Sequence, residues 1–457
     1  MKQKLFLFAL VCCLLTATNM QAQNQNTQYN VSENEKKEVI EMVGKRLVEY
    51  YVFPDVARQM SAALSKNFDD GVYGSIKDAR EFAMTLTRDL WNISRDGHLE
   101  VWFNPQLVLE NKNAAGKQGE VSAEGLQRQI KEAQRDNFGF REVKILDGNI
   151  GYLNLTRFTD TKLGAAAAAA SAMNLLSHTD ALIIDLRQNG GGHPTMVTLL
   201  ASFLFDSKPV LLSDFYVRNG AKETREQEWT LPKVKGKKRP GTDVYILTAF
   251  RTFSAAESFA YSLQGYKRAT VVGERTGGGA HNVTYKIVND NFMIKVPNER
   301  PVDPNTKTNW EKTGVKPDIE TAPKDALLAA QIKALEKLSA ATTADSSTKF
   351  SYEWLLSELR AKLIPVQIDE TVLRSYVGTY SGQLGQRKIT FENGRLFSQR
   401  VNGSKVGLIP LTTDLFTFES RNDVRLKINI ENNRVVGLTS IGIDGTTFQE
   451  SRAKENQ

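Results

Sequence analysis

The run from residue 244 to residue 274 constrains the fold more than any other stretch of this 457-residue sequence. The apolar segment VYILTAF is followed at once by TFSAAES, then by the helix-like AESFAYSLQ and the β-branched ATVVGE. Short apolar runs on either side of an amphipathic segment are typical of strand–helix–strand units with parallel strands. The run therefore predicts an α/β core, with Ser254 at the turn where a strand ends and a helix begins.

Neighbouring segments extend this predicted core. ALIIDLR (181–187) has the fully apolar character of a buried parallel strand, and NGGG and a predicted helix over 194–205 follow it. Residues 142–155 read as two strands joined by the turn DGN, and residues 283–296 as a second hairpin with an ND turn. We therefore expect an α/β core in which a strand–helix–strand unit is accompanied by hairpins.

The regions on either side of the core have different periodicities. Apolar residues recur at helical spacing in three segments before residue 95, and SENE at residue 32 has the form of a capping box. Residues 371–453 alternate apolar and polar positions between NG, NN and DG turns, which predicts an antiparallel barrel or sandwich. We expect these boundaries: a helical domain over 30–95, the core over 96–338, a linker and helix over 339–365, and the β domain over 366–457.

The first 22 residues form a separate segment, with a basic start (MKQK), an apolar run (LFLFALVCCLL) and a small residue at Ala22. This pattern predicts a secretory signal peptide over 1–22, and hence an exported protein, periplasmic or at the cell surface or secreted. Both cysteines lie in this segment, so we expect no disulfide, no thiol nucleophile and no stable membrane insertion after its removal. The net charge of +7 is not gathered into a basic block, so we expect no nucleic-acid partner.

Ser254 stands at a predicted helix start, where a serine usually caps the helix. A strand–turn–helix setting also projects its hydroxyl beyond the sheet, beside the N–H groups of the first helical turn. Ser254 is therefore a candidate nucleophile, and the N–H of Ala255 is the natural first donor to an oxyanion. The NGGG loop after the neighbouring strand could supply a second donor from Gly191 or Gly192.

The residues alone do not select a base among four histidines. His178 ends a predicted helix, His193 directly follows the glycines, and His281 follows TGGGA and could line a pocket. His98 lies on a predicted strand in RDGHLEVW. No pair has the spacing of a zinc site, so we expect no metal.

Three segments in order, ALIIDLRQNGGG, TFSAAESFAYSLQGYKRATVVGERTGGGA and NWEKTGVKPDIE, resemble the tail-specific or C-terminal-processing serine peptidases. The processing branch uses a lysine base after its V-G-E-x-T segment, and Gly279 occupies that position here. RDGHL and W-E-x-x-G-V-x-P-D instead resemble the branch of the tricorn core and the interphotoreceptor retinoid-binding repeats. Segment 32–91 resembles the N-terminal bundle of the retinoid-binding-like proteins, although Gly97 stands where the tricorn enzyme has a serine.

This resemblance implies a crotonase-like ββα peptidase core that cleaves peptide bonds through an acyl-enzyme, without a metal or organic cofactor. Ser254 would be the nucleophile, His98 the proton acceptor and Glu311 the residue that orients His98. Ala255 and Gly191 or Gly192 would form the oxyanion hole. Substrate contacts would come from three further residues, His193, Gly278 and Gly279.

YVGTYSG and NGRLF in the C-terminal region resemble the small lipocalin-like domains appended to bacterial penicillin-binding-type hydrolases and esterases. Such a domain would position substrate or cap the cleft. Two other functions fit the same residues: a non-catalytic ligand-binding protein on this fold, and a hydrolase of a non-peptide ester or amide. The sequence carries no signal for a particular oligomeric state.

Overall fold

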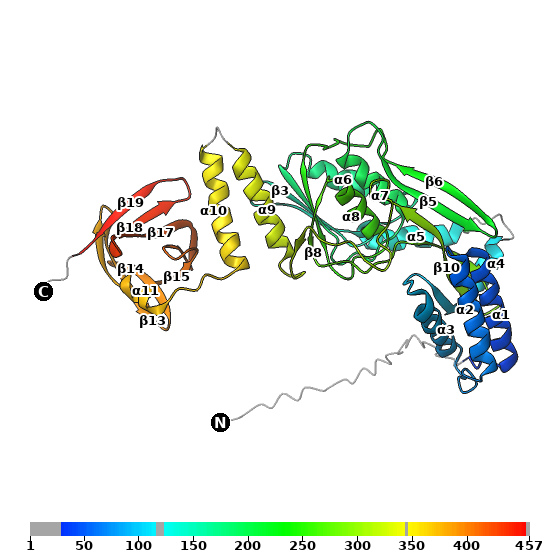
Figure 1. The fold of residues 1–457 in the computed structure, drawn as a ribbon. Helices are drawn as coiled ribbons and strands as arrows, with labels where there is room; N and C mark the ends of the chain where they lie inside the picture. Colours follow the sequence, from blue (N-terminus) through cyan, green and yellow to red (C-terminus); the bar gives the residue numbers. More distant parts are fainter. Residues whose placement is uncertain (1–28, 116–122, 343–345, 454–457) are drawn as a thin grey trace, which may run out of the picture.

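The computed structural model of the protein describes residues 29–115, 123–342 and 346–453 (Figure 1). The predicted signal peptide, residues 1–22, lies outside the described residues. A helical region, an α/β core and a β-barrel follow one another along the chain, which confirms the predicted fold class. Within the described ranges, every helix is too short or too polar to cross a membrane.

The N-terminal region consists of three helices, α1 (Glu33–Tyr50), α2 (Pro54–Asp69) and α3 (Ala79–Ser94). Ser32 caps α1 as predicted, because its hydroxyl accepts a hydrogen bond from the Glu35 N–H at 3.2 Å. The apolar faces of the helices share one buried cluster with strand residues of the core, Val101, Phe292 and Ile294 among them. The bundle is therefore packed against the antiparallel sheet that contains these residues.

A six-stranded sheet forms the centre of the core, in the order β11–β8–β7–β4–β3–β2. Its strands are β2 (Phe140–Leu146), β3 (Ile150–Leu155), β4 (Ala181–Asp185), β7 (Asp243–Thr248), β8 (Thr270–Gly273) and β11 (Ile319–Glu320). All neighbouring pairs are parallel except β2–β3, which forms the predicted hairpin. The predicted strand–helix–strand unit is confirmed as β7, α8 (Ala255–Gly265) and β8.

Helices cover both faces of this sheet. One layer consists of α6 (Ala165–Leu175), α7 (Pro194–Leu204) and α8, and the other of α9 (Ala326–Ala341) and α10 (Ser346–Leu363). Alternate residues of β4 face the two layers: Leu182 and Ile184 pack with the first, and Ile183 packs with the second. This double burial explains why the strand sequences are continuously apolar.

A second, antiparallel sheet has the order β1–β10–β5–β6, with β9 also paired to β10. Its strands are β1 (Glu100–Phe103), β5 (Leu211–Asn219), β6 (Lys222–Trp229), β9 (Asn282–Ile287) and β10 (Phe292–Val302). The β9–β10 hairpin was predicted, whereas β6 was not, because its sequence KETREQEW is exposed and carries no apolar alternation. The helices α4 (Pro105–Ala115) and α5 (Ala123–Arg135) and a 3₁₀ turn, Asn137–Gly139, lie between β1 and β2, and a second 3₁₀ turn, Thr161–Leu163, lies between β3 and α6.

The C-terminal region is a closed antiparallel barrel of eight strands, preceded by the short helix α11 (Glu370–Ser375). The strands are β12 (Gly378–Gly382), β13 (Gly385–Glu392), β14 (Arg395–Arg400), β15 (Val406–Pro410), β16 (Leu415–Phe418), β17 (Arg421–Glu431), β18 (Arg434–Gly442) and β19 (Thr447–Arg452). β12 pairs with both β13 and β19, which closes the barrel and leaves no edge strand. Figure 1 shows α10 next to the barrel, and Arg425 of β17 donates to the Ser357 hydroxyl of α10.

Candidate active site

Ser254 lies in the turn between β7 and α8, with φ 55° and ψ −121°. A non-glycine residue with these angles is strained, and such strain is typical of residues held in place for function. The surrounding backbone is fixed by two hydrogen bonds. The Ser254 N–H donates to Glu257 at 2.9 Å, and the Phe253 N–H donates to the Asn189 carbonyl at 3.1 Å.

The glycine loop after β4 packs directly against Ser254. Gly191 has φ +107°, and a Cβ added there would lie 2.8 Å from the Ser254 Cβ and 3.1 Å from the Ala255 nitrogen. Its N–H donates to the side chain of Asn189 at 2.8 Å, so this amide is already engaged. Among the described residues, the N–H groups of Gly192 and Ala255 have no acceptor. Of the predicted oxyanion donors, these two amides are the ones available.

Glu257 is fully buried and ties the start of α8 to the following glycine loop. Its carboxylate accepts hydrogen bonds from the Thr276 hydroxyl and from the N–H groups of Gly278 (2.7 Å), Gly279 (2.9 Å) and Ser254. Burial raises the pKa of Glu257 to about 7, against the opposing effect of these donors. Gly278 and Gly279 therefore use their amides to shape the loop, and these amides are not available to a substrate.

His98 is buried beside Phe253, the residue before Ser254. The two rings have centroids 4.7 Å apart, and Phe253 fits among Gly97, Gly277 and Gly279, where added Cβ atoms would lie 3.2, 2.8 and 2.1 Å from its ring. Burial lowers the pKa of His98 to about 4, and Asp96 opposes this shift. Among the described residues, His98 Nδ1 has no hydrogen-bond partner, and no hydrogen bond joins His98 to Ser254 or to Glu311.

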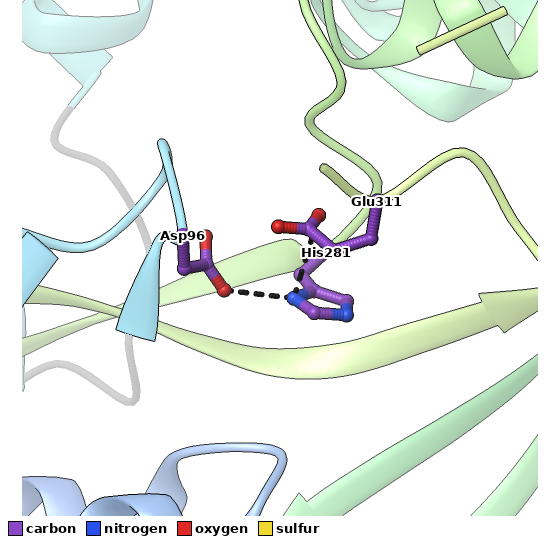
Figure 2. A group of neighbouring side chains, drawn as sticks. All are labelled: Asp96, His281 and Glu311. Atoms are coloured by element: carbon purple, nitrogen blue, oxygen red, sulfur yellow. Dashed lines mark hydrogen bonds and ion pairs between the residues drawn. The ribbon is translucent and has the colours of Figure 1, made fainter. Parts of the chain in front are cut away.

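The histidine next to Glu311 is His281 (Figure 2). Its Nδ1 lies 2.7 Å from Asp96 Oδ2 and 3.6 Å from Glu311 Oε2, so two carboxylates approach the same ring nitrogen from different sides. Asp96 follows α3, His281 precedes β9, and Glu311 lies between β10 and β11. Asp96 Oδ1 also accepts from the N–H of His98 at 3.0 Å, which connects this cluster to the His98 backbone.

The two carboxylates of the cluster have opposite pKa shifts. Burial raises the pKa of Asp96, but the hydrogen bond and charge of His281 outweigh it, and the net shift is downward. Burial raises the pKa of Glu311, and the nearby charge of Asp96 raises it further. Glu311 Oε2 accepts from the Ala280 N–H at 2.7 Å, while its buried Oε1 has no partner among the described residues. Asp96 is therefore the ionised member of the pair, and Glu311 is the one that protonates more easily.

The same three side chains are the group that could hold a metal ion. One ligand atom from each of Asp96, His281 and Glu311 lies within 4.8 Å of the others. Two ligands of one tetrahedral zinc ion would be roughly 3.3 Å apart at ordinary Zn–N and Zn–O distances. The separation of 2.7 Å between His281 and Asp96 is that of a hydrogen bond, so the present geometry is that of a proton-linked pair.

A small depression beside Ser254 is lined mainly by apolar side chains, including Val197, Phe215, Pro301 and Trp310. His193, a predicted substrate contact, is not among its lining residues. It caps α7, accepts from the Thr195 N–H at 3.3 Å, and lies 3.6 Å from Asp160 with its side chain 45% exposed.

Sequence reasoning missed several residues that shape this site. It treated His281 only as a pocket-lining candidate and assigned no role to Asn189 or Glu257. The S-x-x-E spacing of Ser254 and Glu257 has the form of a capping box and could have identified the glutamate. The contact between Asp96 and His281 had no comparable signal, because 185 residues separate them.

Comparisons with known proteins agree with the resemblance drawn from the motifs. Residues 149–321 match the model of peptidase family S41, and residues 30–136 match the N-terminal domain of peptidase S41 in eukaryotic IRBP. The chain is 33% identical over 100 residues to a tail-specific protease of Haemophilus influenzae, covering 22% of this chain and 13% of that protein. It is 27% identical over 195 residues to a carboxy-terminal-processing protease of Bartonella bacilliformis, covering 40% and 42%.

The chain thus spans less than half the length of either curated relative. Among solved structures, it is similar to the photosystem II D1 C-terminal processing protease, with a TM-score of 0.41, 17% identity, and coverage of 64% of this chain and 94% of that one. The two family models together cover more than half of the sequence and meet at the site built around Ser254. On these matches, the chain belongs to peptidase family S41.

Proposed function

We propose that this protein is an exported serine peptidase in which Ser254 attacks the carbonyl carbon of a peptide bond. The observation that carries the proposal is the strained backbone of Ser254, held between β7 and α8 beside the Ala255 N–H, which has no acceptor in the described part of the chain. Attack would form a tetrahedral intermediate, and breakage of its C–N bond would release the amine half of the substrate, protonated by the base, and leave an acyl-enzyme that water then hydrolyses to the acid. The amides of Ala255 and Gly192 would stabilise the oxyanion in both steps.

His98 is the proposed acceptor of the Ser254 proton. Its lowered pKa keeps the imidazole neutral at neutral pH, as a proton acceptor must be. Among the described residues no hydrogen bond joins it to Ser254, so the transfer requires either a bridging water or a movement of Phe253 when substrate binds.

Glu311 is assigned an indirect role in place of the direct contact with His98 that the resemblance implied. Its carboxylate lies next to His281, which is hydrogen-bonded to Asp96, and Asp96 accepts from the backbone of His98. We therefore treat Glu311, His281 and Asp96 as positioning residues for His98.

The depression beside Ser254 favours a substrate with a small apolar side chain next to the scissile bond. No step of this mechanism needs a metal or an organic cofactor. The basic and apolar pattern of the first 22 residues supports export, with the periplasm as the proposed location.

Fluorophosphonate labelling of the purified protein, with mass mapping of the adduct, tests the proposal. We expect one adduct on Ser254, which is absent in Ser254→Ala. In His98→Gln, labelling of Ser254 should be at least about 10²-fold slower. His281→Gln is the matched histidine control and should retain more labelling than His98→Gln. The reverse order would make His281 the base. Labelling elsewhere, or none, would overturn the proposal and favour a ligand-binding protein on the same fold.

A second assay separates the substrate classes. Peptides and small non-peptide esters should be compared as substrates of the same preparation, with Ser254→Ala as the blank. Turnover of esters but not peptides would make the protein a non-peptide hydrolase.

A further inference from the structure

One end of the C-terminal barrel contains a cavity of about 440 Å³, far along the chain from Ser254. Its rim comes from the turns β12–β13, β14–β15, β16–β17 and β18–β19, which lie at the same end of the barrel. The volume is in the range of small-molecule sites, and the mouth of a β-barrel is a frequent place for one.

The interior of this cavity carries more positive than negative charge. Arg387 and Arg400 both line it and both pair with the same carboxylate, Glu450, at 2.9 Å and 2.6 Å. The side chains of Arg387 and Glu450 are 5% and 0% exposed, so water does little to solvate this group. A third lining arginine, Arg421, is neutralised by Asp423. Two guanidinium groups thus share one anion, and the Arg400 side chain, which is 30% exposed, carries the excess positive charge at the cavity, where an anionic ligand can balance it.

The hydrogen bonds of the cavity are unbalanced in the same direction. Arg387 has five N–H donors, and four of them reach acceptors: two on Glu450 and one each on Ser398 and Ser440. The hydroxyls of Ser398 and Ser440, both buried, accept from Arg387 and have no acceptor for their own protons among the described residues. One N–H of Arg387 and the two hydroxyl protons therefore have no acceptor among the described residues.

Part of the remaining lining of the cavity is apolar. Phe418, Phe448, Val406 and Val424 contribute to its wall, and the Arg387 guanidinium lies 5.7 Å from the centre of the Phe418 ring. A ligand that contacts both the arginine and serine side chains and the apolar wall has an anionic group with several hydrogen-bond acceptors and a compact apolar group. A planar carboxylate matches the fork of an arginine and the two hydroxyls.

We propose that this end of the barrel binds an organic carboxylate with a compact apolar group, supplied by a free acid or by the last residue of a peptide. Arg387, Arg400, Ser398 and Ser440 hold the carboxylate, and the phenylalanine and valine side chains hold the apolar group. The site is separate from Ser254 and does not depend on its chemistry.

Calorimetric titration of the full chain with 4-methylpentanoate tests this proposal, with 4-methylpentanamide as the neutral analogue of the same shape. We expect the acid to bind with a Kd of about 1 mM or tighter, and the amide at least about tenfold more weakly. Ser254→Ala should bind the acid as the wild type does. In that variant, a short peptide ending in leucine and its C-terminal amide show whether a chain end also enters the site.

Arg400→Gln removes the excess charge and leaves the Arg387–Glu450 pair, so it should weaken binding of the acid at least about tenfold. Lys388→Gln is the matched control, because Lys388 is the next residue to Arg387 on β13 and faces outward. Circular dichroism checks that both variants are folded. If Arg400→Gln unfolds, the double variant Ser398→Ala/Ser440→Ala takes its place with the same expectation. Equal binding of acid and amide, no binding at about 10 mM, or equal losses in Arg400→Gln and Lys388→Gln would overturn the proposal.

Discussion

His281 Nδ1 lies 2.7 Å from Asp96 Oδ2, although 185 residues separate the two in the chain. Asp96 belongs to the segment that follows α3, and His281 belongs to the loop that follows β8. Both side chains are almost completely buried, with exposures of 0% and 1%. This pair therefore fixes the segment that carries His98 to the core that carries Ser254.

The first prediction concerns the stability of this pair. His281→Gln removes the imidazole that lies 2.7 Å from the buried Asp96 carboxylate, so the free energy of unfolding should fall by about 3 kcal/mol. Urea unfolding of the full chain measures this loss. The matched control is His193→Gln, because His193 also faces an aspartate, but its side chain is 45% exposed. We expect a loss of about 1 kcal/mol or less there. Similar losses in both variants would show that the buried pair has no special role.

The second prediction uses the glycine loop next to Ser254. Gly191→Ala should abolish fluorophosphonate labelling and lower stability by about 1–3 kcal/mol, because the new Cβ would press on Ser254 and φ is +107°. Gly190→Ala is the control in the same loop, since a Cβ there meets nothing within 4 Å. Labelling of Gly191→Ala at the rate of Gly190→Ala would contradict the tight fit of the loop against the serine.

The third prediction concerns pH. The pKa of His98 is about 4 in the folded protein, below its ordinary value of 6.5, so the unfolded chain binds more protons between these values. The contribution of neutral His98 to the free energy of unfolding is fully present above about pH 6.5. It decreases by up to roughly 3 kcal/mol as the pH falls towards 4. Urea unfolding across this range should therefore show a steeper decline in the wild type than in His98→Gln. His178→Gln, at an exposed histidine, should keep the wild-type slope.

Much of the fold follows from local sequence signals, whereas much of the site does not. The β7–α8–β8 unit and the β9–β10 hairpin could be predicted because each is built from neighbouring segments with clear periodicity. Strand β6 could not, since its exposed sequence lacks the alternation of a half-buried strand. The closed barrel was one of two predicted arrangements, because alternation alone does not reveal whether the first and last strands pair.

The site depends on contacts between distant segments. The position of Ser254 follows from its own turn, but the neighbours of Glu311 depend on how three separate loops meet. The motif resemblance linked Glu311 to His98, whereas the structure places its carboxylate beside His281. No local pattern indicates which of two buried histidines a distant carboxylate will approach.

The fourth prediction concerns Glu257, which accepts from one hydroxyl and three backbone N–H groups around Ser254. In Glu257→Gln an NH₂ group replaces one of the accepting oxygens, so at least one buried donor loses its acceptor and faces another donor. We expect a loss of about 2–3 kcal/mol in the free energy of unfolding and at least about tenfold slower labelling of Ser254. Urea unfolding and fluorophosphonate kinetics measure the two effects.

Glu274→Gln provides the control for this substitution. Glu274 is exposed, and one backbone N–H, that of Phe250, donates to its carboxylate at 3.0 Å. Its replacement should change stability by about 0.5 kcal/mol or less. A Glu257→Gln protein with wild-type labelling would mean that the geometry of Ser254 does not depend on the carboxylate. A protein that loses labelling without losing stability would instead show that Glu257 acts through the position of the Ser254 backbone alone.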